Sequence, residues 1–194
     1  MLVVGSLLMF AVMSIEPIIT VYVQQLVPDP SRVTWVAGVV MSATALGSIL
    51  SATRLGKLGD RIGHWSVLAA GLVVAAVLLI PQAFVTASWQ LVALRFLMGM
   101  ALGGLLHCVT SLIRHHAPAR ATGMLLGYAT SSQYAGQVAG PLLGGFIGGH
   151  LGMRPVFLGT SLLLMAGAAL TWRAARAAKA SPAYPQAVPD PDPR

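Results

Sequence analysis

Six long apolar stretches fill most of this 194-residue chain, and they constrain its fold more than any other feature. A helix that crosses a membrane needs about 20 mostly apolar residues, because the hydrocarbon core of a bilayer is about 30 Å thick. The sequence therefore predicts an all-α integral membrane protein with six transmembrane helices. The expected spans are Leu2 to Leu26, Val33 to Thr53, Trp65 to Val85, Ser88 to Ile113, Ala121 to Gly148 and Pro155 to Trp172.

The composition supports a membrane protein. Apolar residues make up 56% of the chain and charged residues only 9%, whereas soluble domains carry about 25% charge. A net charge of +7 would suggest nucleic acid as the partner of a soluble protein. Here the basic residues lie at span ends, so we expect a lipid bilayer as partner and no nucleic acid. Met1 is followed directly by apolar residues without a basic n-region, which argues against a signal peptide.

Lysine and arginine are distributed unevenly between the two sides of the predicted bundle. Only Arg32 and Arg154 fall in the loops after odd-numbered spans. Cytoplasmic loops of membrane proteins are enriched in Lys and Arg, so we expect both termini in the cytoplasm. The eight basic residues that follow the second, fourth and sixth spans are Arg54, Lys57, Arg61, Arg114, Arg120, Arg173, Arg176 and Lys179.

The chain divides into two parts. Residues 1–172 form the predicted six-span domain, and residues 173–194 form a tail that is first basic and then rich in proline. From Ser181 onward, Pro alternates with Asp and Ala, which is typical of disordered, partly polyproline-like segments.

Small residues recur at helical spacing inside the spans. Such small-xxx-small patterns let helix backbones approach closely in lipid, so they predict a tightly packed bundle. The residues concerned are Gly99 and Gly103, Gly123 and Gly127, and Gly136, Gly140 and Gly144.

Glu16 is a carboxylate inside the first span. It lies ten residues before Leu26, which corresponds to a depth of about 15 Å. Intramembrane carboxylates are costly, and they commonly mark ion or proton pathways. Pro17 follows it and weakens the local helical hydrogen bonding. We interpret Glu16 as a proton-coupling or cation-binding group; the alternative is a protonated residue that only packs between helices.

Arg95 is the other charge within a span, about two turns from the outer end of the fourth. It could pair with Glu16 at a similar depth, or contact a substrate. The alternative is that its long side chain reaches the outer interface, which is cheap at such a shallow position.

The fifth span combines amides with a flexible segment. Gln133 and Gln137 are one turn apart and share a face, which suits a cavity wall; alternatively, one of them makes a single interhelical hydrogen bond. Pro141 removes a backbone hydrogen bond, and the glycines beside it permit a bend. The residues expected to allow bending are Gly136, Gly140, Pro141, Gly144 and Gly145.

A charged, glycine-containing run follows the second span. It reads Gly56-Lys57-Leu58-Gly59-Asp60-Arg61-Ile62-Gly63, and it predicts a tight cytoplasmic turn. Asp60 would favour a neighbouring helix N-terminus and Arg61 a carboxylate, so the turn could latch the bundle; otherwise it is a solvated turn that only sets topology.

No metal site or catalytic set is expected. His107-Cys108 and His115-His116 are adjacent pairs, whose side chains point in different directions on a helix and make poor ligand sites. The single Cys108 excludes an internal disulfide and any cysteine-based metal cluster. The chain has no nucleophilic triad or phosphate-binding loop, so we expect no enzyme activity and no bound cofactor.

Taken together, these runs resemble the major facilitator superfamily, specifically the twelve-span drug:proton antiporters of bacteria. The run Ser51 to Gly63 resembles the cytoplasmic loop motif of that family in its second-half form, although His64-Trp65 stands where basic residues usually continue it. Arg95-x-x-x-Gly99-x-x-x-Gly103 looks like the fourth-helix Arg motif. The segment Gly136 to Gly145 is similar to the antiporter motif. Ser14-Ile15-Glu16-Pro17 and Tyr22-Val23 look like the start of the second half.

The resemblance implies one half of a major facilitator fold, a 3+3 inverted repeat equivalent to spans seven to twelve. It implies proton-driven export of small amphipathic molecules across the inner membrane of a bacterium, with the proton gradient as the energy source. Glu16 and Arg95 then become candidates for the proton or substrate pathway, and Asp60 and Arg61 for the cytoplasmic gate. The partner would be a missing N-terminal six-helix half or a second copy. The alternatives are a half-transporter that works only as a dimer and a truncated membrane protein that does not transport.

Overall fold

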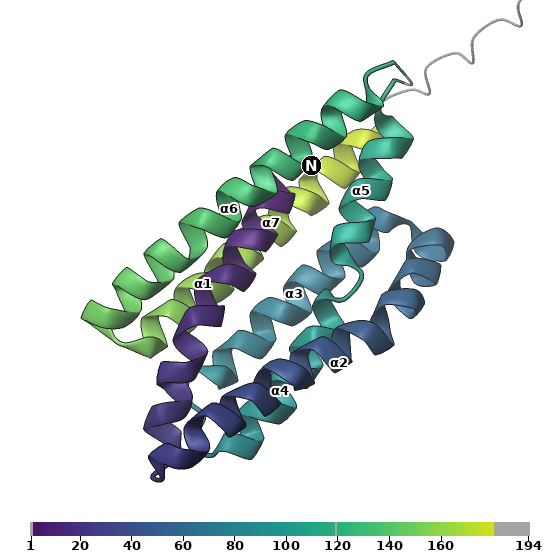
Figure 1. Ribbon diagram of the computed structural model, residues 1–194. Helices are drawn as coiled ribbons and strands as arrows, with labels where there is room; N and C mark the ends of the chain where they lie inside the picture. The colour runs from purple at the N-terminus through teal and green to yellow at the C-terminus, as the bar shows by residue number, and fades with distance from the viewer. Residues whose placement is uncertain (1, 119, 181–194) are drawn as a thin grey trace, which may run out of the picture.

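The computed structural model describes residues 2–118 and 120–180, which form a bundle of long helices (Figure 1). The helices are α1 (Leu2–Leu26), α2 (Pro30–Ile62), α3 (His64–Gln82), α4 (Ser88–Leu102), α5 (Leu105–His116), α6 (Thr122–Leu151) and α7 (Met153–Ala180). The predicted all-α fold is confirmed. The tail from residue 181 onward lies outside the described residues.

The helix ends follow ordinary signals in the sequence. Asp29 caps α2: its carboxylate accepts a hydrogen bond of 3.0 Å from the Ser31 amide, and Pro30 occupies the first turn. Gly63 separates α2 from α3, and Gly152 separates α6 from α7, with φ angles of 93° and 88°. Positive φ values are costly for residues with a Cβ, which explains glycine at both turns.

Five segments are long and apolar enough to cross a membrane, judged by length and composition over the described residues. They are α1, α2, α3, the stretch Ser88–His115 that contains α4 and α5, and α7. α6 is not among them because Gly, Ser and Gln lower its hydropathy. It has 30 residues, about 45 Å of helix, and packs along α1. The fifth expected span, Ala121 to Gly148, therefore remains a prediction.

Two of the expected boundaries are wrong. The second span was expected to end at Thr53, but α2 continues as a helix to Ile62. The fourth expected span, Ser88 to Ile113, agrees with the membrane-spanning stretch Ser88–His115, although its helix is interrupted at Gly103 and Gly104 between α4 and α5. The sixth expected span was placed at Pro155 to Trp172, but its helix, α7, continues to Ala180.

Three helix pairs make the most extensive contacts: α1 with α6, α2 with α4, and α3 with α7. If the α4–α5 stretch counts as one span, the chain consists of two three-helix units in sequence. The first helix of each unit packs against the second helix of the other, and the two third helices pack together. This exchange of partners is the arrangement expected of a 3+3 repeat.

Glycines allow the first two pairs to pack closely. A Cβ on Gly136, Gly140 or Gly144 of α6 would come within 3 Å of α1 backbone atoms between Ser6 and Ser14. On the other pair, a Cβ on Gly47 of α2 would meet the α4 backbone. Gly99 and Gly103 of α4 would meet α2 in the same way. These contacts confirm the predicted packing role of five of the seven glycines. The prediction is wrong for Gly123 and Gly127, where a Cβ would meet no atom within 4 Å.

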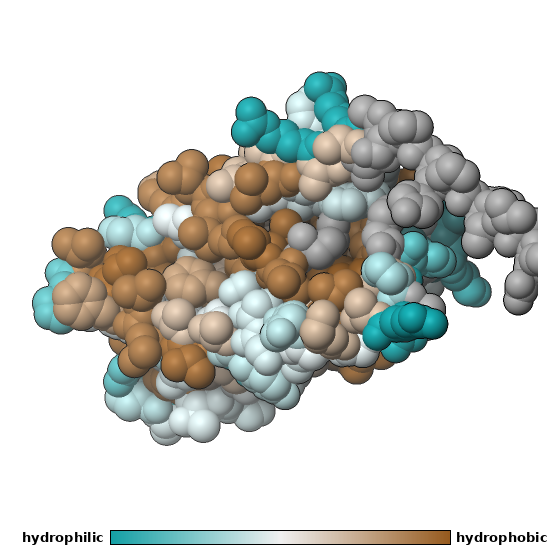
Figure 2. Space-filling view, turned by 90° about the horizontal axis from the view of Figure 1, so that it is seen from above, coloured by the Kyte–Doolittle hydropathy of each residue, from teal (hydrophilic) through white to brown (hydrophobic). Residues whose placement is uncertain are grey.

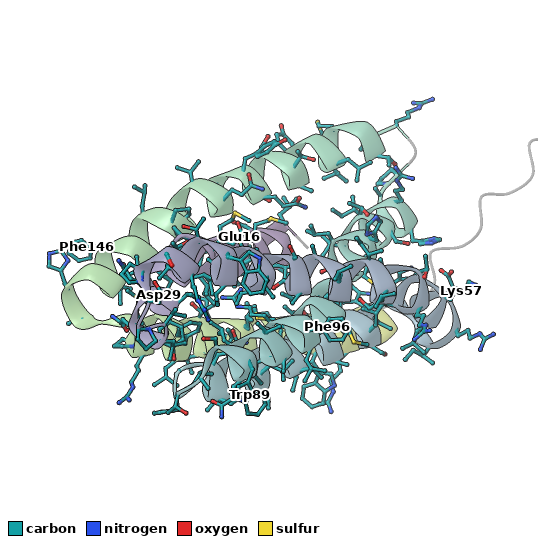
Figure 3. The ribbon with its side chains drawn as sticks, turned by 60° about the horizontal axis from the view of Figure 1, so that its bottom comes forward. Glu16, Asp29, Lys57, Trp89, Phe96 and Phe146 are labelled. Carbon is teal, nitrogen blue, oxygen red and sulfur yellow. The ribbon has the colours of Figure 1, made fainter. Side chains whose placement is uncertain are left out.

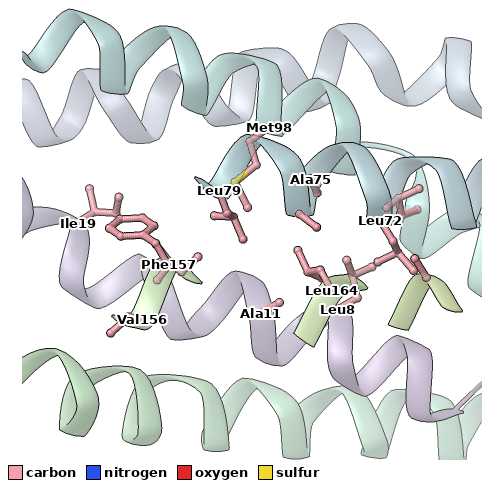
Figure 4. Close-up of a cluster of buried hydrophobic side chains, with 14 of the residues drawn as sticks. Leu8, Ala11, Ile19, Leu72, Ala75, Leu79, Met98, Val156, Phe157 and Leu164 are labelled. Atoms are coloured by element: carbon pink, nitrogen blue, oxygen red, sulfur yellow. The ribbon is translucent and has the colours of Figure 1, made fainter. Parts of the chain in front are cut away.

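The centre of the bundle is filled mainly by aliphatic side chains, and the Phe157 ring packs among them (Figure 4). Phe157 of α7 is fully buried and packs against the Tyr22 ring, with 5.2 Å between centroids. The Ser161 hydroxyl of α7 donates a hydrogen bond of 2.7 Å to the Ala76 carbonyl of α3. The outer surface is also apolar: brown side chains cover much of the face in Figure 2, and the most hydrophilic ones lie toward its margins.

The two ends of the bundle are defined by side-chain contacts. At one end, the Tyr22 hydroxyl donates to the Gln82 carbonyl at 2.9 Å, and the Arg154 guanidinium lies over the Phe84 ring at 5.5 Å. At the other end, the His64 and His115 rings lie 6.0 Å apart. This second end contains the α2–α3 turn and the C-terminus of α5, and basic residues are concentrated there; we call it the basic end of the bundle.

Candidate functional site

A cavity of about 360 Å³ lies between α1, α2, α4 and α5, and both intramembrane charges line it. Glu16 reaches it from α1 and Arg95 from α4. The remaining lining is mostly apolar and comes from all four helices. It consists of Leu8, Met9, Val12, Ile19, Val40, Met41, Thr44, Ala45, Ser48, Met98, Leu102 and Leu106.

Glu16 lies well inside the bundle along its length. In Figure 3 it is found between Asp29 at one end and Lys57 at the other. Its side chain is exposed on the cavity surface rather than packed among other helices. A carboxylate at this depth, open to a cavity, can exchange a proton or attract a cation.

Arg95 is buried, with only 5% of its surface exposed. Its side chain therefore does not reach the outer interface, which was the alternative left open by the sequence. Its Nε and Nη2 atoms have no hydrogen-bond partner among the described residues. No ion pair joins it to Glu16, although both line one cavity. A buried guanidinium with free donors is costly, and it favours binding of an acceptor in the cavity.

Sequence reasoning missed most of the cavity wall. Met9, Met41 and Met98 enter from three different helices, and flexible thioether side chains adapt to ligands of different shape. Thr44 and Ser48 add hydroxyls whose protons go to the Val40 and Gly99 carbonyls, at 3.2 and 3.1 Å. The signal was the spacing of Met41, Thr44 and Ser48, which repeats with the period of one helix face.

Gln133 and Gln137 do not line this cavity. They lie on the side of α6 that faces α1: the Gln137 amide is 3.6 Å from the Met9 sulfur, and the Gln133 side chain lies beside Gly5. Since Met9 lines the cavity, the two amides lie behind its wall. A direct role in the pathway remains a prediction for both.

The Gly-Pro segment of α6 stays helical. α6 runs without interruption from Thr122 to Leu151 and includes Pro141. Gly136, Gly140 and Gly144 face α1, whereas a Cβ on Gly145 would meet no atom within 4 Å. Close packing thus accounts for three of the four glycines, and bending at this segment remains a prediction.

The predicted tight turn at residues 56–63 is wrong. Gly56, Gly59, Asp60 and Arg61 belong to the last turns of α2, and only Gly63 turns the chain. The reason is that α2 keeps its hydrogen bonds through the glycines, and the Gly63 amide donates to the Gly59 carbonyl at 2.9 Å.

The end of α2 is nevertheless tied to its neighbours. The Asp60 carboxylate lies 3.5 Å from His64 Nε2, and the His64 ring packs over Gly59 and faces His115 of α5. A Cβ on Gly59 would lie 3.1 Å from that ring. His64 therefore links the end of α2 to α5, although it stands where the family pattern has a basic residue. Arg61 is exposed.

The described residues 2–118 and 120–180 contain no group of three His, Cys, Asp or Glu side chains that could hold a metal ion. Cys108 is buried, and His107 is exposed beside it.

Comparison with known proteins relates this arrangement to one family. The profile of the Major Facilitator Superfamily matches residues 1–191. Curated relatives include the multidrug resistance protein MdtG of Dickeya zeae and of Salmonella typhimurium, each 38% identical over 163 residues. MdtG of Citrobacter koseri is 37% identical over the same length.

The matched region covers 84% of this chain but only 40% of those relatives. The chain thus matches a partial unit of the family, and the half-fold seen in the structure agrees with that extent. The resemblance found in the loop, Arg and antiporter motifs is confirmed. This chain is a multi-pass membrane protein that belongs to the Major Facilitator Superfamily.

Proposed function

We propose that the chain forms one six-helix half of a proton-coupled exporter of small amphipathic molecules. The observation that carries this proposal is the cavity in which a carboxylate, a buried guanidinium and three methionines come together. In this family's architecture, substrate and coupling-ion sites lie near mid-membrane between the two halves. Glu16, which lines the cavity, lies ten residues before the end of α1 at Leu26, about 15 Å along the helix, and this supports a position near that depth.

Glu16 is the proton carrier in this proposal. Its carboxylate faces the cavity, so it can be protonated from the outer side and release the proton to the inner side as access alternates. When ionised, it attracts a cationic substrate. The same group then cannot hold a proton and the cation at once, which couples the two fluxes.

Arg95 orients whatever occupies the cavity. Its Nε and Nη2 atoms are buried without a hydrogen-bond partner among the described residues, beside a largely apolar cavity. A guanidinium can donate to a carbonyl, a hydroxyl or the Glu16 carboxylate. The methionines supply adaptable apolar contact. This combination fits a range of amphipathic compounds better than one polar metabolite.

The energy source in the proposal is the proton gradient, with no bound cofactor and no enzyme activity. Asp60 and Arg61, at the basic end of the bundle, would gate the cytoplasmic side, and the segment Gly136 to Gly145 would allow α6 to bend. The excess of Lys and Arg at this end supports cytoplasmic termini and a place in the inner membrane of a bacterium.

The partner in the proposal is a second six-helix half. The chain spans about two fifths of its curated relatives. We therefore expect the remaining half in the same polypeptide, in a separate chain or in a second copy of this chain. An immunoblot against residues 181–194 distinguishes a fused half from an unfused one. A band at roughly twice 20.2 kDa means a fused partner, and a band near 20.2 kDa means a separate one.

The test of function is efflux of a fluorescent cationic dye from cells, driven by an imposed pH gradient. We expect Glu16→Gln to abolish the proton-dependent part while the amount in the membrane is unchanged. Glu16→Asp keeps a titratable group and should retain part of the activity. Equal efflux by Glu16→Gln and the unaltered protein would contradict the assignment. Absence of any efflux by the unaltered protein would favour a membrane protein that does not transport.

A further inference from the structure

An apolar groove of about 470 Å³ runs along the outside of the bundle, between α3 and α7. Small side chains form its floor, and Trp172 closes it toward the basic end. The lining includes Ala69, Ala70, Val73, Ala168, Ala169 and Trp172. No residue of α3 or α7 lines the cavity that holds Glu16, so the groove faces a different side of the molecule.

The groove is open to the membrane rather than to the protein core. Val73 and Trp172 are 38% and 54% exposed, and almost no polar surface lines the groove. The groove therefore suits an acyl chain of a lipid. Methylene groups can fill it without leaving any polar group unpaired.

The charge at one end of the groove decides which lipid fits. The Arg176 guanidinium lies over the Trp172 ring, 3.6 Å from its centroid. This stack places a cation beside the groove, and a guanidinium stacked by its face can donate hydrogen bonds from its edge. Arg173 is exposed on the same turn of α7. Basic side chains at the membrane surface attract anionic headgroups.

We propose that this groove is a binding site for one anionic phospholipid. An acyl chain lies between α3 and α7, and Arg176 binds the headgroup phosphate. The proposal is independent of the transported substrate, because it uses none of the residues assigned to the proton pathway. A zwitterionic phospholipid carries the same phosphate but no net charge, so the two lipid classes can be compared directly.

The experiment measures quenching of Trp172 fluorescence by phospholipids with brominated chains. The full chain is reconstituted into vesicles of phosphatidylcholine in which either phosphatidylglycerol or phosphatidylcholine is the brominated lipid. Subtracting the signal of Trp172→Phe isolates Trp172. We expect an affinity about fivefold higher for phosphatidylglycerol, the factor that one basic side chain near a headgroup supplies.

Two variants test the two parts of the site. Arg176→Gln removes the cation, and Ala169→Phe fills the groove; each should abolish the preference for phosphatidylglycerol. Their matched controls are Arg114→Gln, an exposed arginine at the same end, and Ala166→Phe, an exposed alanine of α7 outside the groove. Both controls should keep the preference.

Equal quenching by the two lipids would overturn the proposal and indicate ordinary annular lipid. A preference that persists in Arg176→Gln would overturn the assignment of Arg176. Should a variant not fold, salt provides the same test on the unaltered protein. The preference must weaken as ionic strength rises, and a preference insensitive to salt contradicts a headgroup bound by charge.

Discussion

Arg95 and Glu16 line the same cavity from α4 and α1, and no ion pair joins them. The guanidinium is buried with two nitrogens unpaired, whereas the carboxylate is exposed to the cavity. Two opposite charges that share a cavity without neutralising each other leave both free to act on a third group. In the proposed mechanism, this arrangement leaves both groups available to substrate and proton, and it has measurable consequences.

We expect Arg95→Gln to leave the protein equally or more stable and to lower efflux about tenfold or more. Stability should hold because removal of an unpaired buried charge relieves its desolvation cost. Efflux should fall because a charge-assisted hydrogen bond contributes about 1.5–3 kcal/mol. The measurements are thermal unfolding in detergent and dye efflux, with Arg95→Lys as the variant that keeps the charge. Lower stability together with unchanged efflux would mean that Arg95 is a structural residue.

Gly144→Ala should destabilise the bundle by about 1–3 kcal/mol, the usual cost of overpacking. The new Cβ would collide with backbone atoms of Ser14, which cannot turn aside as a flexible side chain can. The neighbouring Gly145→Ala is the matched control, because its Cβ meets open space. Unfolding by sodium dodecyl sulfate in mixed micelles measures both. Equal stability of the two variants would contradict the close α1–α6 contact.

Gly99→Ala should cost about as much as Gly144→Ala, about 1–3 kcal/mol. The physical reason is that a Cβ on Gly99 would strike the Thr44 backbone of α2, the equivalent contact in the other helix pair. Gly38→Ala, at an exposed glycine of α2 with nothing near its Cβ, is the control. A difference of several kcal/mol between the two glycine contacts would argue against their equivalence.

Asp60→Asn should change the free energy of unfolding by less than about 1 kcal/mol, because exposed ion pairs contribute little. The Asp60 side chain is 74% exposed, and its contact with His64 spans 3.5 Å. If Asp60 gates the cytoplasmic side, efflux will nonetheless fall. Asp29→Asn removes a carboxylate from the opposite end and should alter neither quantity. Loss of folding in Asp60→Asn would show that the contact is structural, and unchanged efflux would remove Asp60 from the gate.

The sequence was sufficient for the class of fold, because hydropathy is a local property that adds up along each span. Sequence-based prediction was less reliable at glycines, because glycine occurs both at turns and at close helix contacts. Glycine at 56 and 59 suggested a turn, but the intact hydrogen bonds of α2 kept these residues helical. Gly99 and Gly103 suggested a packing pattern inside one continuous span. Both glycines do pack against α2, but the helix also breaks at Gly103.

The candidate site was predictable only in part. Glu16 and Arg95 could be selected because charges are rare within spans, and the structure brings them to one cavity. The other residues that line the cavity depend on which helices face each other, and the sequence of a single helix does not determine this. Met9 and Thr44 therefore went unnoticed, whereas Gln137, chosen for its polarity, lies behind the wall.

The exchange of partners between the two three-helix units also affects how the chain must fold. α1 leaves the ribosome before the other six helices, but its main partner is α6, and the partner of α2 is α4. Neither three-helix unit can bury its glycine-lined faces alone. The helices inserted before α4 and α6 therefore remain without these packing partners in the bilayer until α4 and α6 are inserted. Contacts so distant in sequence slow folding. A nascent chain stopped after α3 should therefore remain accessible to proteases and quality control, and assembly becomes cooperative only once α6 has been synthesised.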